Sequence, residues 1–383
     1  MALDPETREQ LISSVARFVR ERLVPIEEQV SREDRVPDDI VQEMRDLGLF
    51  GLSIPVEYGG LGLSMEEEAL VCFELGQTSP AFRSVIGTNV GIGSQGLVMF
   101  GRPEQKDYWL PRIASGETIA SFCLTEPGAG SDAASVRTTA IRKGDVYVVN
   151  GTKRYITNAA KAGAFTLMAR TNPDNKGAGG ISAFFVPSDL KGITVGKPEK
   201  KMGQQGAHIH DVIFEDCEIP AECLIGDREG EGFKLAMQVL DRGRLHISAV
   251  CVGVSERLVR DSVAYAVDRE QFGQRIADFQ MIQAMLADSK MEAYAARCMV
   301  LETARKRDAG QNIAMEASCC KLFASEAVGR IADRNVQIHG GAGYVADYAA
   351  ERFYRDVRIF RLYEGTSQIQ QMVIAKSLIR AAG

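Results

Sequence analysis

The sequence has no uninterrupted apolar run near the roughly 18 residues that a membrane-spanning helix needs. Its first ten residues, MALDPETREQ, are polar and acidic, and they lack the basic and then apolar pattern of a secretory leader. Basic charge is not in excess either, because the net charge is −6 at pH 7. These absences predict a cytoplasmic protein that associates with neither membranes nor nucleic acid.

Cysteine pairs and metal-ligand spacings are also missing. None of the eight cysteines forms a Cys-x-x-Cys motif, and the four histidines include no His-x-x-x-His pair. His208 and His210 would share one face of a strand, but no third ligand lies nearby in the sequence. The sequence therefore predicts reduced cysteines and no metal site.

What is present is an ordinary globular composition, with 45% hydrophobic and 25% charged residues over a length of 383. That length exceeds what one hydrophobic core usually supports, so we expect two or three domains. Helical periodicity with Gly-rich turns fills residues 1–118, short β-branched and aromatic runs fill residues 119–228, and helical periodicity returns over residues 229–383. The predicted fold class is α+β, with an N-terminal helical domain, a middle β-barrel-like domain and a C-terminal four-helix bundle.

The middle region carries two turn signals between strand-like runs. Residues 143–145 separate a strand at 140–142 from one at 146–149, and Asn150-Gly151 predicts a two-residue hairpin before the next strand. Further strands are expected at 164–169, 181–186 and 212–214. Downstream, apolar residues recur on one helical face from Leu240 to Leu258, which predicts a long amphipathic helix.

Residues 91–96, Gly-Ile-Gly-Ser-Gln-Gly, match the glycine fingerprint of dinucleotide-binding proteins. That fingerprint has a physical meaning only between a strand and a helix of a βαβ unit. Here Ser79-Pro80 is typical of a helix N-cap followed by proline in the first turn. We therefore expect the segment to lie in a helix whose small residues allow close packing, rather than in an NAD site.

Two loops have compositions that suit ligand binding. Residues 123–132 combine a proline, two glycines and the hydroxyls of Thr125 and Ser131. Such a loop can hold a ring edge or a phosphate, or it can be an ordinary surface turn. Glu364 precedes a glycine, just before a final helix that begins near residues 366–367. On these residues alone Glu364 is either a reactive base or an exposed carboxylate favoured by the helix dipole.

Several stretches, in the same order and over nearly the full chain, make the sequence resemble the acyl-CoA dehydrogenase family. They are Gly51–Gly60, Leu124–Asp132, Tyr155–Asn158, Arg269–Gly273, Gln337–Gly341 and Tyr363–Thr366. The resemblance implies an FAD enzyme of fatty-acid or amino-acid catabolism that dehydrogenates an acyl-CoA thioester to the 2-enoyl-CoA. It also implies a homotetramer that passes electrons to an electron-transferring flavoprotein.

The same resemblance implies roles for individual residues. Contacts to the flavin ring correspond to Leu124, Thr125, Tyr155 and Thr157. Residues that hold the FAD adenosine and pyrophosphate across a subunit interface correspond to Arg269, Phe272, Gln280, Gln337, Gly340 and Gly341. Further FAD contacts correspond to Thr366 and Gln368, and acyl-CoA contacts to Ser131, Asp241 and Arg244. Ser131 lies in the flavin loop, so we expect it beside the cofactor as well.

Within this resemblance Glu364 is the base that removes the α-proton, while the β-hydrogen leaves as hydride to flavin N5. The α-proton of a thioester is far too weakly acidic for a carboxylate in water. The site must therefore raise the pKa of Glu364 by desolvation and aim donors, including the Glu364 N–H, at the thioester oxygen. Some family members carry the base on the preceding long helix. This chain has Gly243 there, which leaves Glu364 as the candidate, and Tyr155 replaces the Trp of many relatives.

Arg83 bears on the identity of the substrate. It lies in the first turn of a predicted helix, where a cation opposes the helix dipole unless an anion lies beside it. By resemblance it occupies the position at which glutaryl-CoA dehydrogenases hold the distal carboxylate of their substrate, and Arg can bind a carboxylate with two parallel hydrogen bonds. The alternative is a plain salt bridge, for example to Glu74, or a solvent-facing side chain.

Other functions stay open on the sequence alone. A same-fold acyl-CoA oxidase would have a reduced flavin that air reoxidises rapidly, whereas a same-fold desulfinase typically lacks the base that Glu364 provides. An NAD(P) dehydrogenase built on residues 91–96 and a non-catalytic acyl-CoA binder are alternatives of other classes. The resemblance favours a dehydrogenase, including the glutaryl-CoA type that oxidises an acidic acyl-CoA.

Overall fold

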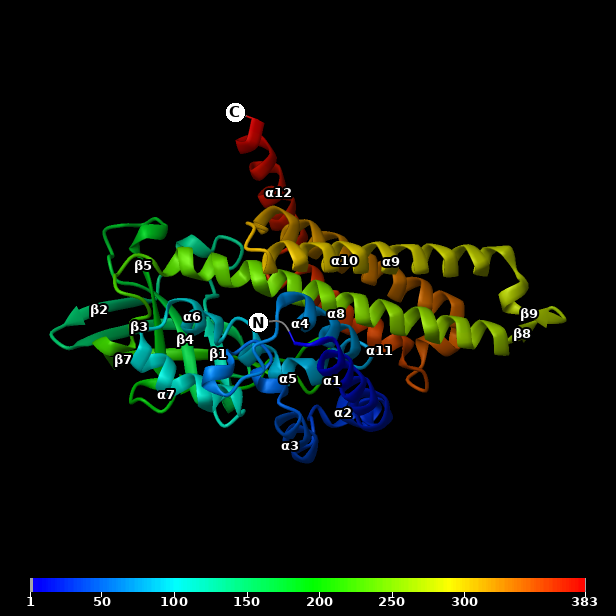
Figure 1. The fold of residues 1–383 in the computed structure, drawn as a ribbon, viewed down its shortest axis with the longest axis horizontal. Helices are drawn as coiled ribbons and strands as arrows, with labels where there is room; N and C mark the ends of the chain where they lie inside the picture. Colours follow the sequence, from blue (N-terminus) through cyan, green and yellow to red (C-terminus); the bar gives the residue numbers. More distant parts are fainter. Residues whose placement is uncertain (1–2, 383) are drawn as a thin grey trace.

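The computed structural model describes residues 3–382, which form helices, then a β-sheet, then long helices (Figure 1). The sheet lies toward one end of the long axis, and a small hairpin projects at the other end (Figure 1). This order of helical, β and helical regions confirms the predicted fold class. The predicted domain boundaries at 118/119 and 228/229 fall between these elements, and the division into domains stays a prediction.

The N-terminal region is a series of short helices, of which the first five share one apolar core and the last two contribute to the core of the sheet region. The helices are α1 Pro5–Phe18, α2 Glu27–Glu33, α3 Asp38–Asp46, α4 Met65–Leu75, α5 Pro80–Val90, α6 Gln95–Phe100 and α7 Pro103–Ala114. Ser64 and Glu67 form a capping box at the start of α4, and the Ser79 hydroxyl accepts from the Ala81 N–H at the start of α5. These caps fix where the two helices that border the site begin.

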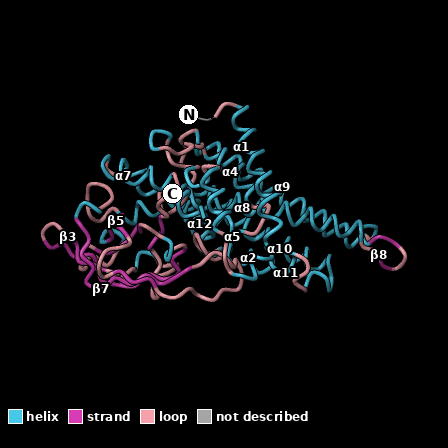
Figure 2. The backbone as a smooth tube through the Cα atoms, turned by 90° about the horizontal axis from the view of Figure 1, so that it is seen from below, coloured by secondary structure: helices cyan, strands magenta, loops and turns pink. Residues whose placement is uncertain are grey.

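The middle region is a seven-stranded curled sheet with the order β1-β4-β2-β3-β7-β6, in which β5 also pairs with β4. Its strands are β1 Ala120–Cys123, β2 Thr139–Lys143, β3 Val146–Thr157, β4 Ala164–Arg170, β5 Ile181–Pro187, β6 Ile193–Val195 and β7 Ile209–Pro220. β3 and β7 pair antiparallel along most of their length and gather at one side of the molecule, away from the helices (Figure 2).

The hairpin predicted at Asn150-Gly151 is wrong, because β3 runs through it without turning. The register between β3 and β7 shifts there instead, which is a β-bulge. A Cβ at Gly151 would overlap Thr138, so glycine serves the close approach of β2 rather than a turn. The turn lies at Gly144, whose φ is 61°, as predicted for residues 143–145.

The C-terminal region consists of α8 Gly232–Asp268, α9 Gln280–Asp308, α10 Ala314–His339, α11 Ala349–Asp356 and α12 Ser367–Ala382. The hairpin β8 Glu270–Gln271 and β9 Gln274–Arg275 joins α8 to α9. α8, α9 and α10 pack against one another around an apolar core, and α12 packs on α10 (Figure 1). α12 begins at Ser367, as the sequence predicts.

α4 lies directly against α8, and two glycines make this possible. A Cβ at Gly253 of α8 would overlap the carbonyl of Phe73, and one at Gly76 would lie 2.6 Å from the Val250 carbonyl. The backbones can therefore approach more closely than side chains normally permit. This close contact brings polar residues of α4 over the face of α8 that borders the site.

The glycine-rich segment 91–96 contains no strand followed by a helix. α5 ends at Val90, residues 91–94 form a turn, and α6 starts at Gln95. The expectation of a continuous helix is therefore wrong, because the turn at Gly93 packs against the Ala120 carbonyl, where a Cβ would lie 2.5 Å away. The close packing itself is confirmed, and the surroundings are not those of a dinucleotide fingerprint.

None of the helices formed by residues 3–382 combines the length and apolar character that crossing a bilayer requires.

Candidate active site

Glu364 lies in the short connection before α12, in an unusual backbone conformation. Its φ is 55° and that of Gly365 is 88°, both in the left-handed region. The Oε2 atom is buried and finds no hydrogen-bond partner within residues 3–382. Burial, the largest effect, raises the pKa of Glu364, while Arg83, Arg244 and Lys321 oppose that rise. The result is a fixed carboxyl group with a raised affinity for a proton.

The connection that carries Glu364 is held by its carbonyl groups. Gln370 Nε2 donates to the carbonyls of Glu364 and Gly365, both at 3.0 Å. The buried Lys321 of α10 donates from Nζ to the Gly365 carbonyl at 2.6 Å. Burial lowers the pKa of Lys321 to about 8, so its charge is present at neutral pH.

Gly243 of α8 lies against the carboxyl group of Glu364. A Cβ at position 243 would stand 2.7 Å from Glu364 Oε2, which is closer than real side chains approach. The absence of a side chain on α8 therefore makes room for the carboxylate. By resemblance, some relatives carry the base on this helix, and in this chain position 243 lies against the Glu364 carboxyl group.

Asp241 and Arg244, predicted to contact acyl-CoA, lie on the same segment of α8. Arg244 Nη1 donates to Asp241 Oδ1 at 2.7 Å, and Arg244 Nε lies 3.5 Å from the Glu364 carbonyl. Both residues are thus brought to the Glu364 connection. Ser131 is exposed in the loop after β1, in the sheet region.

Arg83 also reaches the site, but its partner differs from both alternatives that the sequence offers. The Arg83 Nε–H donates to His246 Nε2 of α8 at 2.8 Å, and Arg83 forms no ion pair with Glu74 or any other carboxylate of residues 3–382. The plain salt bridge is therefore wrong. The positive charge of Arg83 opposes the rise in the pKa of both Tyr363 and Glu364, so the guanidinium acts electrostatically on the candidate base.

The loop predicted to contact a flavin is held by hydrogen bonds from β3. Buried Lys153 donates from Nζ to the Leu124 carbonyl at 3.1 Å and to Glu126 Oε1 at 2.7 Å. The Arg154 N–H donates to the Thr125 carbonyl at 2.8 Å. Leu124 is buried in the core beneath the loop, Thr125 is half-buried, and the loop glycines are exposed, since a Cβ at Gly128 or Gly130 would meet nothing within 4 Å.

Tyr155 stands at a bulge in β3, where its register with β7 shifts. Its φ is 59°, and its side chain is 54% exposed. A bulky residue in the left-handed region is strained, and such strain is common at ligand-binding sites. The bulge thus presents an exposed aromatic ring on β3, opposite the start of β7.

The residues predicted for the adenosine and pyrophosphate gather around the β8–β9 hairpin and the end of α10. Ile276 and Ile338 pack in one apolar cluster that ties the two segments together. Phe272 at the tip is 94% exposed with a φ of 55°, and a Cβ at Gly340 or Gly341 would meet nothing within 4 Å. Arg269, Gln280 and Gln337 are also exposed. The β8–β9 hairpin lies at the end of the molecule opposite the sheet (Figure 1).

Thr366 and Gln368 lie at the start of α12. The Thr366 hydroxyl accepts from the Ile369 N–H at 3.2 Å and caps the helix, while Gln368 is exposed. The structure also shows hydrogen-bond or ion-pair partners for His208 and His210. His208 lies 3.2 Å from Asp34, and His210 Nδ1 lies 2.9 Å from the Gly196 carbonyl, so both join neighbouring segments. Residues 3–382 contain no cluster of three potential metal ligands.

Sequence reasoning missed three polar residues beside the site: Glu68, His246 and Lys321. Each is at most 1% exposed. The available signal was a polar residue inside an apolar helical pattern, since His246 directly precedes Ile247 and Lys321 directly follows Cys320. Charged or polar groups at such positions are buried only when they are paired, so they indicate a network rather than surface.

Family models cover nearly the whole chain. Those for the N-terminal, middle and C-terminal domains of acyl-CoA dehydrogenase match residues 5–117, 121–217 and 230–379.

Curated relatives match over the same length. Acryloyl-CoA reductase (NADH) of Anaerotignum propionicum is 41% identical over 378 residues, covering 98% of this chain and 95% of the relative. The mitochondrial short-chain specific acyl-CoA dehydrogenase of Homo sapiens is 40% identical over 379 residues, covering 98% and 91%.

Solved structures share the fold throughout. A chain from the electron-transferring flavoprotein work on Acidaminococcus fermentans has a TM-score of 0.95 at 37% identity, covering 99% of this chain and 100% of that one. Glutaryl-CoA dehydrogenase in complex with glutaryl-CoA has a TM-score of 0.93 at 31% identity, covering 99% and 96%. An acyl-CoA dehydrogenase from Bacillus anthracis complexed with FAD has a TM-score of 0.91 at 36% identity, covering 100% and 69%. Together with the geometry around Glu364, these matches establish that the chain belongs to the acyl-CoA dehydrogenase family, FAD-dependent oxidoreductases that act on acyl-CoA thioesters.

Proposed function

We propose that Glu364 is the base that removes the α-proton of an acyl-CoA thioester as it is oxidised to the 2-enoyl-CoA. The observation that carries this proposal is the buried Oε2 atom without a hydrogen-bond partner among residues 3–382. A carboxylate in that setting lacks the solvation that stabilises its charge, so its affinity for a proton rises. Base catalysis improves as the pKa of the base approaches the operating pH.

The backbone around Glu364 supports the same role. A non-glycine residue in the left-handed region costs on the order of 1–3 kcal/mol and persists only where its surroundings hold it. Here Gln370 and Lys321 hold the two carbonyls of the connection. The Glu364 N–H donates to no backbone carbonyl of residues 3–382, so it is free to bind the thioester oxygen.

The cofactor contacts remain a proposal about individual residues. Leu124, Thr125, Ser131, Tyr155 and Thr157 would border the flavin ring, and FAD, when bound, supplies the acceptor for the β-hydrogen as hydride. The residues that would hold the FAD adenosine and pyrophosphate are Arg269, Phe272, Gln280, Gln337, Gly340 and Gly341, with Thr366 and Gln368 as further contacts. The sheet region that carries the first group and the β8–β9 hairpin near the second lie toward opposite ends of the molecule, which supports sites completed by a second copy in a homotetramer (Figure 1). We further propose an electron-transferring flavoprotein as the electron acceptor.

A second, narrower function is favoured by one observation: Arg83 is near enough to the candidate base to lower its pKa, and it has no carboxylate partner among residues 3–382. A buried or half-buried guanidinium is normally paired, and its planar fork matches a carboxylate. We therefore propose that the acyl chain ends in an acidic group that Arg83 recognises, with Asp241 and Arg244 beside the thioester. The solved relative with bound glutaryl-CoA makes this substrate class a natural first test.

The base assignment is tested by replacing Glu364 with glutamine and mixing the FAD-loaded enzyme anaerobically with glutaryl-, butyryl- and hexanoyl-CoA. Loss of flavin absorbance reports the oxidation directly. Because the amide keeps the shape of the side chain but cannot accept the proton, we expect Glu364→Gln to bind the thioesters and to lose roughly 10²–10⁴-fold in reduction rate.

A Glu364→Gln enzyme that bleaches near the wild-type rate would remove Glu364 from the chemistry. The same thioester panel separates the narrower proposal, since a clear preference of the wild type for the neutral thioesters would contradict an acidic substrate. Rapid reoxidation of the reduced wild-type flavin by air would indicate the acyl-CoA oxidase alternative instead of a dehydrogenase.

A further inference from the structure

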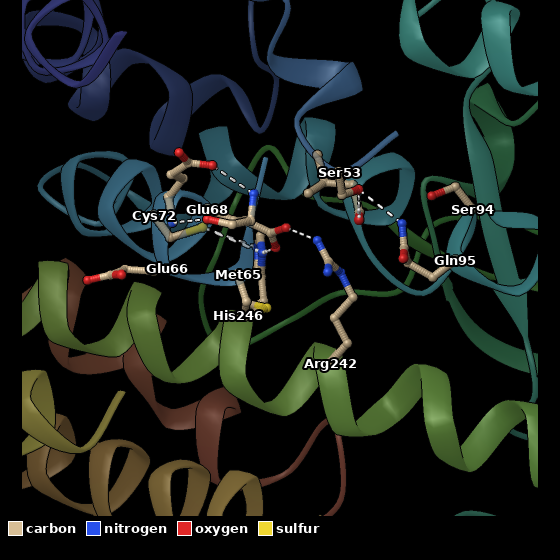
Figure 3. Close-up of polar contacts among 12 residues, drawn as sticks. Ser53, Met65, Glu66, Glu68, Cys72, Ser94, Gln95, Arg242 and His246 are labelled. Atoms are coloured by element: carbon tan, nitrogen blue, oxygen red, sulfur yellow. Dashed lines mark hydrogen bonds and ion pairs between the residues drawn. The ribbon is translucent and has the colours of Figure 1, made fainter. Parts of the chain in front are cut away.

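His246 is a buried imidazole that touches Arg83 on one side and a buried carboxylate on the other. It belongs to the apolar face of α8 and is 1% exposed. His246 Nε2 lies 2.8 Å from Arg83 Nε, and His246 Nδ1 lies 2.6 Å from Glu68 Oε1 of α4. The second oxygen of Glu68 is bound by Arg242, one turn earlier on α8 (Figure 3). The four side chains form one continuous line.

The direction of each hydrogen bond follows from the chemistry of arginine. A guanidinium has only donors and stays charged in proteins, so Arg83 Nε–H must donate and His246 Nε2 must accept. A ring with an accepting Nε2 is neutral and carries its proton on Nδ1. That proton points at Glu68 Oε1, which can only accept. Burial lowers the pKa of His246 to about 4, in agreement with a neutral ring.

Glu68 and Arg242 fix this arrangement from behind. Glu68 is fully buried, and its carboxylate is shared between Arg242 and the His246 Nδ1–H. The carboxylate cannot donate, so the opposite tautomer of His246 would leave both Glu68 and Arg83 facing the wrong atoms. Such pairing of a neutral histidine with a carboxylate selects one tautomer and one ring orientation.

The consequence is a preset position for Arg83. Its Nε is occupied by His246, while its Nη nitrogens have no acceptor within residues 3–382. Gly87, one turn later on α5, leaves room for the group, because a Cβ there would lie 2.8 Å from Arg83 Cζ. A guanidinium that is already oriented loses less conformational freedom when it binds an anion.

We propose that His246, held as the neutral Nδ1–H tautomer by Glu68 and Arg242, is a positioning residue that orients Arg83 for an acidic group on the acyl chain. The proposal rests on the acidic substrate class proposed above. It assigns His246 no contact with the reacting atoms. Under this proposal the preference among substrates depends on His246, which contacts Arg83 and not the substrate.

The tautomer is tested without any substrate. Solid-state ¹⁵N NMR of holoenzyme labelled with ¹³C,¹⁵N-histidine contains signals from only four histidines, and His246→Gln identifies those of His246. We expect a protonated nitrogen bonded to Cγ, which is Nδ1, and an unprotonated Nε2. In Arg83→Met the Nε2 signal should shift because its donor is removed, while Nδ1 stays protonated. A protonated Nε2, or an Nε2 signal unaffected by Arg83→Met, would overturn the positioning role.

The effect on substrate choice is tested with His246→Leu and His246→Gln. Leucine cannot accept from Arg83, whereas a glutamine oxygen can accept from Arg83 while its amide donates to Glu68. We expect His246→Leu to raise the KM for glutaryl-CoA roughly tenfold or more while the kcat/KM for butyryl-CoA changes little, and His246→Gln to restore most of the preference. A merely structural role would lower the melting temperature and affect both thioesters equally, which would overturn the proposal.

The two tests keep two failures apart. The spectra can show the Nδ1–H tautomer and an Nε2 signal that shifts in Arg83→Met while the wild type does not prefer acidic thioesters. In that case the proposed substrate class is wrong, and so is the role of His246 in specificity. If the wild type prefers acidic thioesters and loses that preference in Arg83→Met but not in His246→Leu, the substrate class stands and the positioning role fails.

Discussion

Two glutamates close to α8, each with a buried carboxylate oxygen, differ in what surrounds that carboxylate. Glu68 of α4 is fully enclosed and bound by Arg242 and His246. Burial is the strongest single effect and opposes its charge, yet those two partners, Arg242 foremost, hold the pKa of Glu68 below its usual value. Glu364 has a buried Oε2 without any partner in residues 3–382, and the same burial raises its pKa.

The difference teaches what separates a structural carboxylate from a reactive one. Burial penalises the charged form in both places, and only the supply of hydrogen bonds and opposite charge decides which way the pKa moves. Glu68 serves as a fixed anion that organises His246 and Arg242. Glu364 is surrounded by cations that act on it from a distance without binding it, which leaves it able to take up a proton.

The largest effect, on the free energy of unfolding, is expected when the ion pair of Glu68 with Arg242 is removed. Glu68→Gln removes the charge that offsets buried Arg242, so the free energy of unfolding should fall by about 3–5 kcal/mol. Because the pKa of Glu68 is lowered in the folded state, this stabilisation is present at neutral pH and is lost as the pH falls through that lowered value. Denaturant unfolding of the FAD-loaded protein measures both.

A matched control for this change lies on the same helix. Glu66 pairs with Arg305 at 2.8 Å, but the arginine side chain is 57% exposed. Glu66→Gln should therefore cost less than about 1 kcal/mol. Equal decreases in the free energy of unfolding in the two variants would show that the buried ion pair of Glu68 contributes no more than the exposed pair of Glu66.

A somewhat smaller effect is expected from crowding the unpartnered carboxylate. In Gly243→Ala the new methyl carbon would lie 2.7 Å from Glu364 Oε2, so the carboxylate must move. We expect kcat/KM to fall roughly 10²-fold, since displacement of a catalytic group by about 1 Å has effects of that size. The melting temperature should hold or rise, because alanine favours a helix interior by about 1 kcal/mol over glycine.

Gly96→Ala in α6 provides the comparison, because a Cβ there would make ordinary contact at 3.4 Å with Leu235. It should leave kcat/KM unchanged. Wild-type activity in Gly243→Ala would mean that Glu364 does not need the space that Gly243 leaves.

The smallest effect is expected from removing a cation near the unpartnered carboxylate. Lys321→Met deletes the 2.6 Å bond to the Gly365 carbonyl, and charge-assisted bonds contribute about 1.5–3 kcal/mol, so kcat should fall roughly tenfold. The pKa of Glu364 should also rise further. Since burial lowers the pKa of Lys321 to about 8, the wild type loses the same charge above that pH, and the charge-dependent part of the difference should narrow there.

Steady-state rates from pH 6 to 9 measure this, with half-exposed Lys306, which lies 3.8 Å from Glu316, replaced by methionine as the control. A Lys321→Met enzyme with the wild-type rate at every pH would show that the connection before α12 holds Glu364 without help from α10.

Much of the architecture could be predicted because apolar periodicity, helix caps and turn residues are local features of the sequence. Apolar periodicity from Leu240 to Leu258 predicted α8, the Ser79-Pro80 pair predicted the start of α5, and the turn signal at residues 143–145 predicted the β2–β3 hairpin. The Asn150-Gly151 prediction failed because glycine occurs both in turns and where two backbones approach closely, as Gly151 does at Thr138. Only the fold distinguishes the two uses.

The line from Arg83 to Arg242 could not be predicted in the same way. His246 is separated from Arg83 by 163 positions and from Glu68 by 178, so no short motif joins them. Their meeting depends on the close contact of α4 with α8, which Gly76 and Gly253 permit. Glu364 was predictable as a candidate by resemblance, but the absence of a partner for its Oε2 is a property of the packed site.

The most direct test of the contrast between the two glutamates is the pH dependence of flavin reduction in the wild type. Anaerobic single-turnover mixing with a saturating acyl-CoA thioester isolates the chemical step from product release. Because the pKa of Glu364 is raised, the rate should fall with decreasing pH through an apparent pKa above the ordinary glutamate value of about 4.3. A rate that stays constant down to pH 5, or falls only at the ordinary value, would contradict the account.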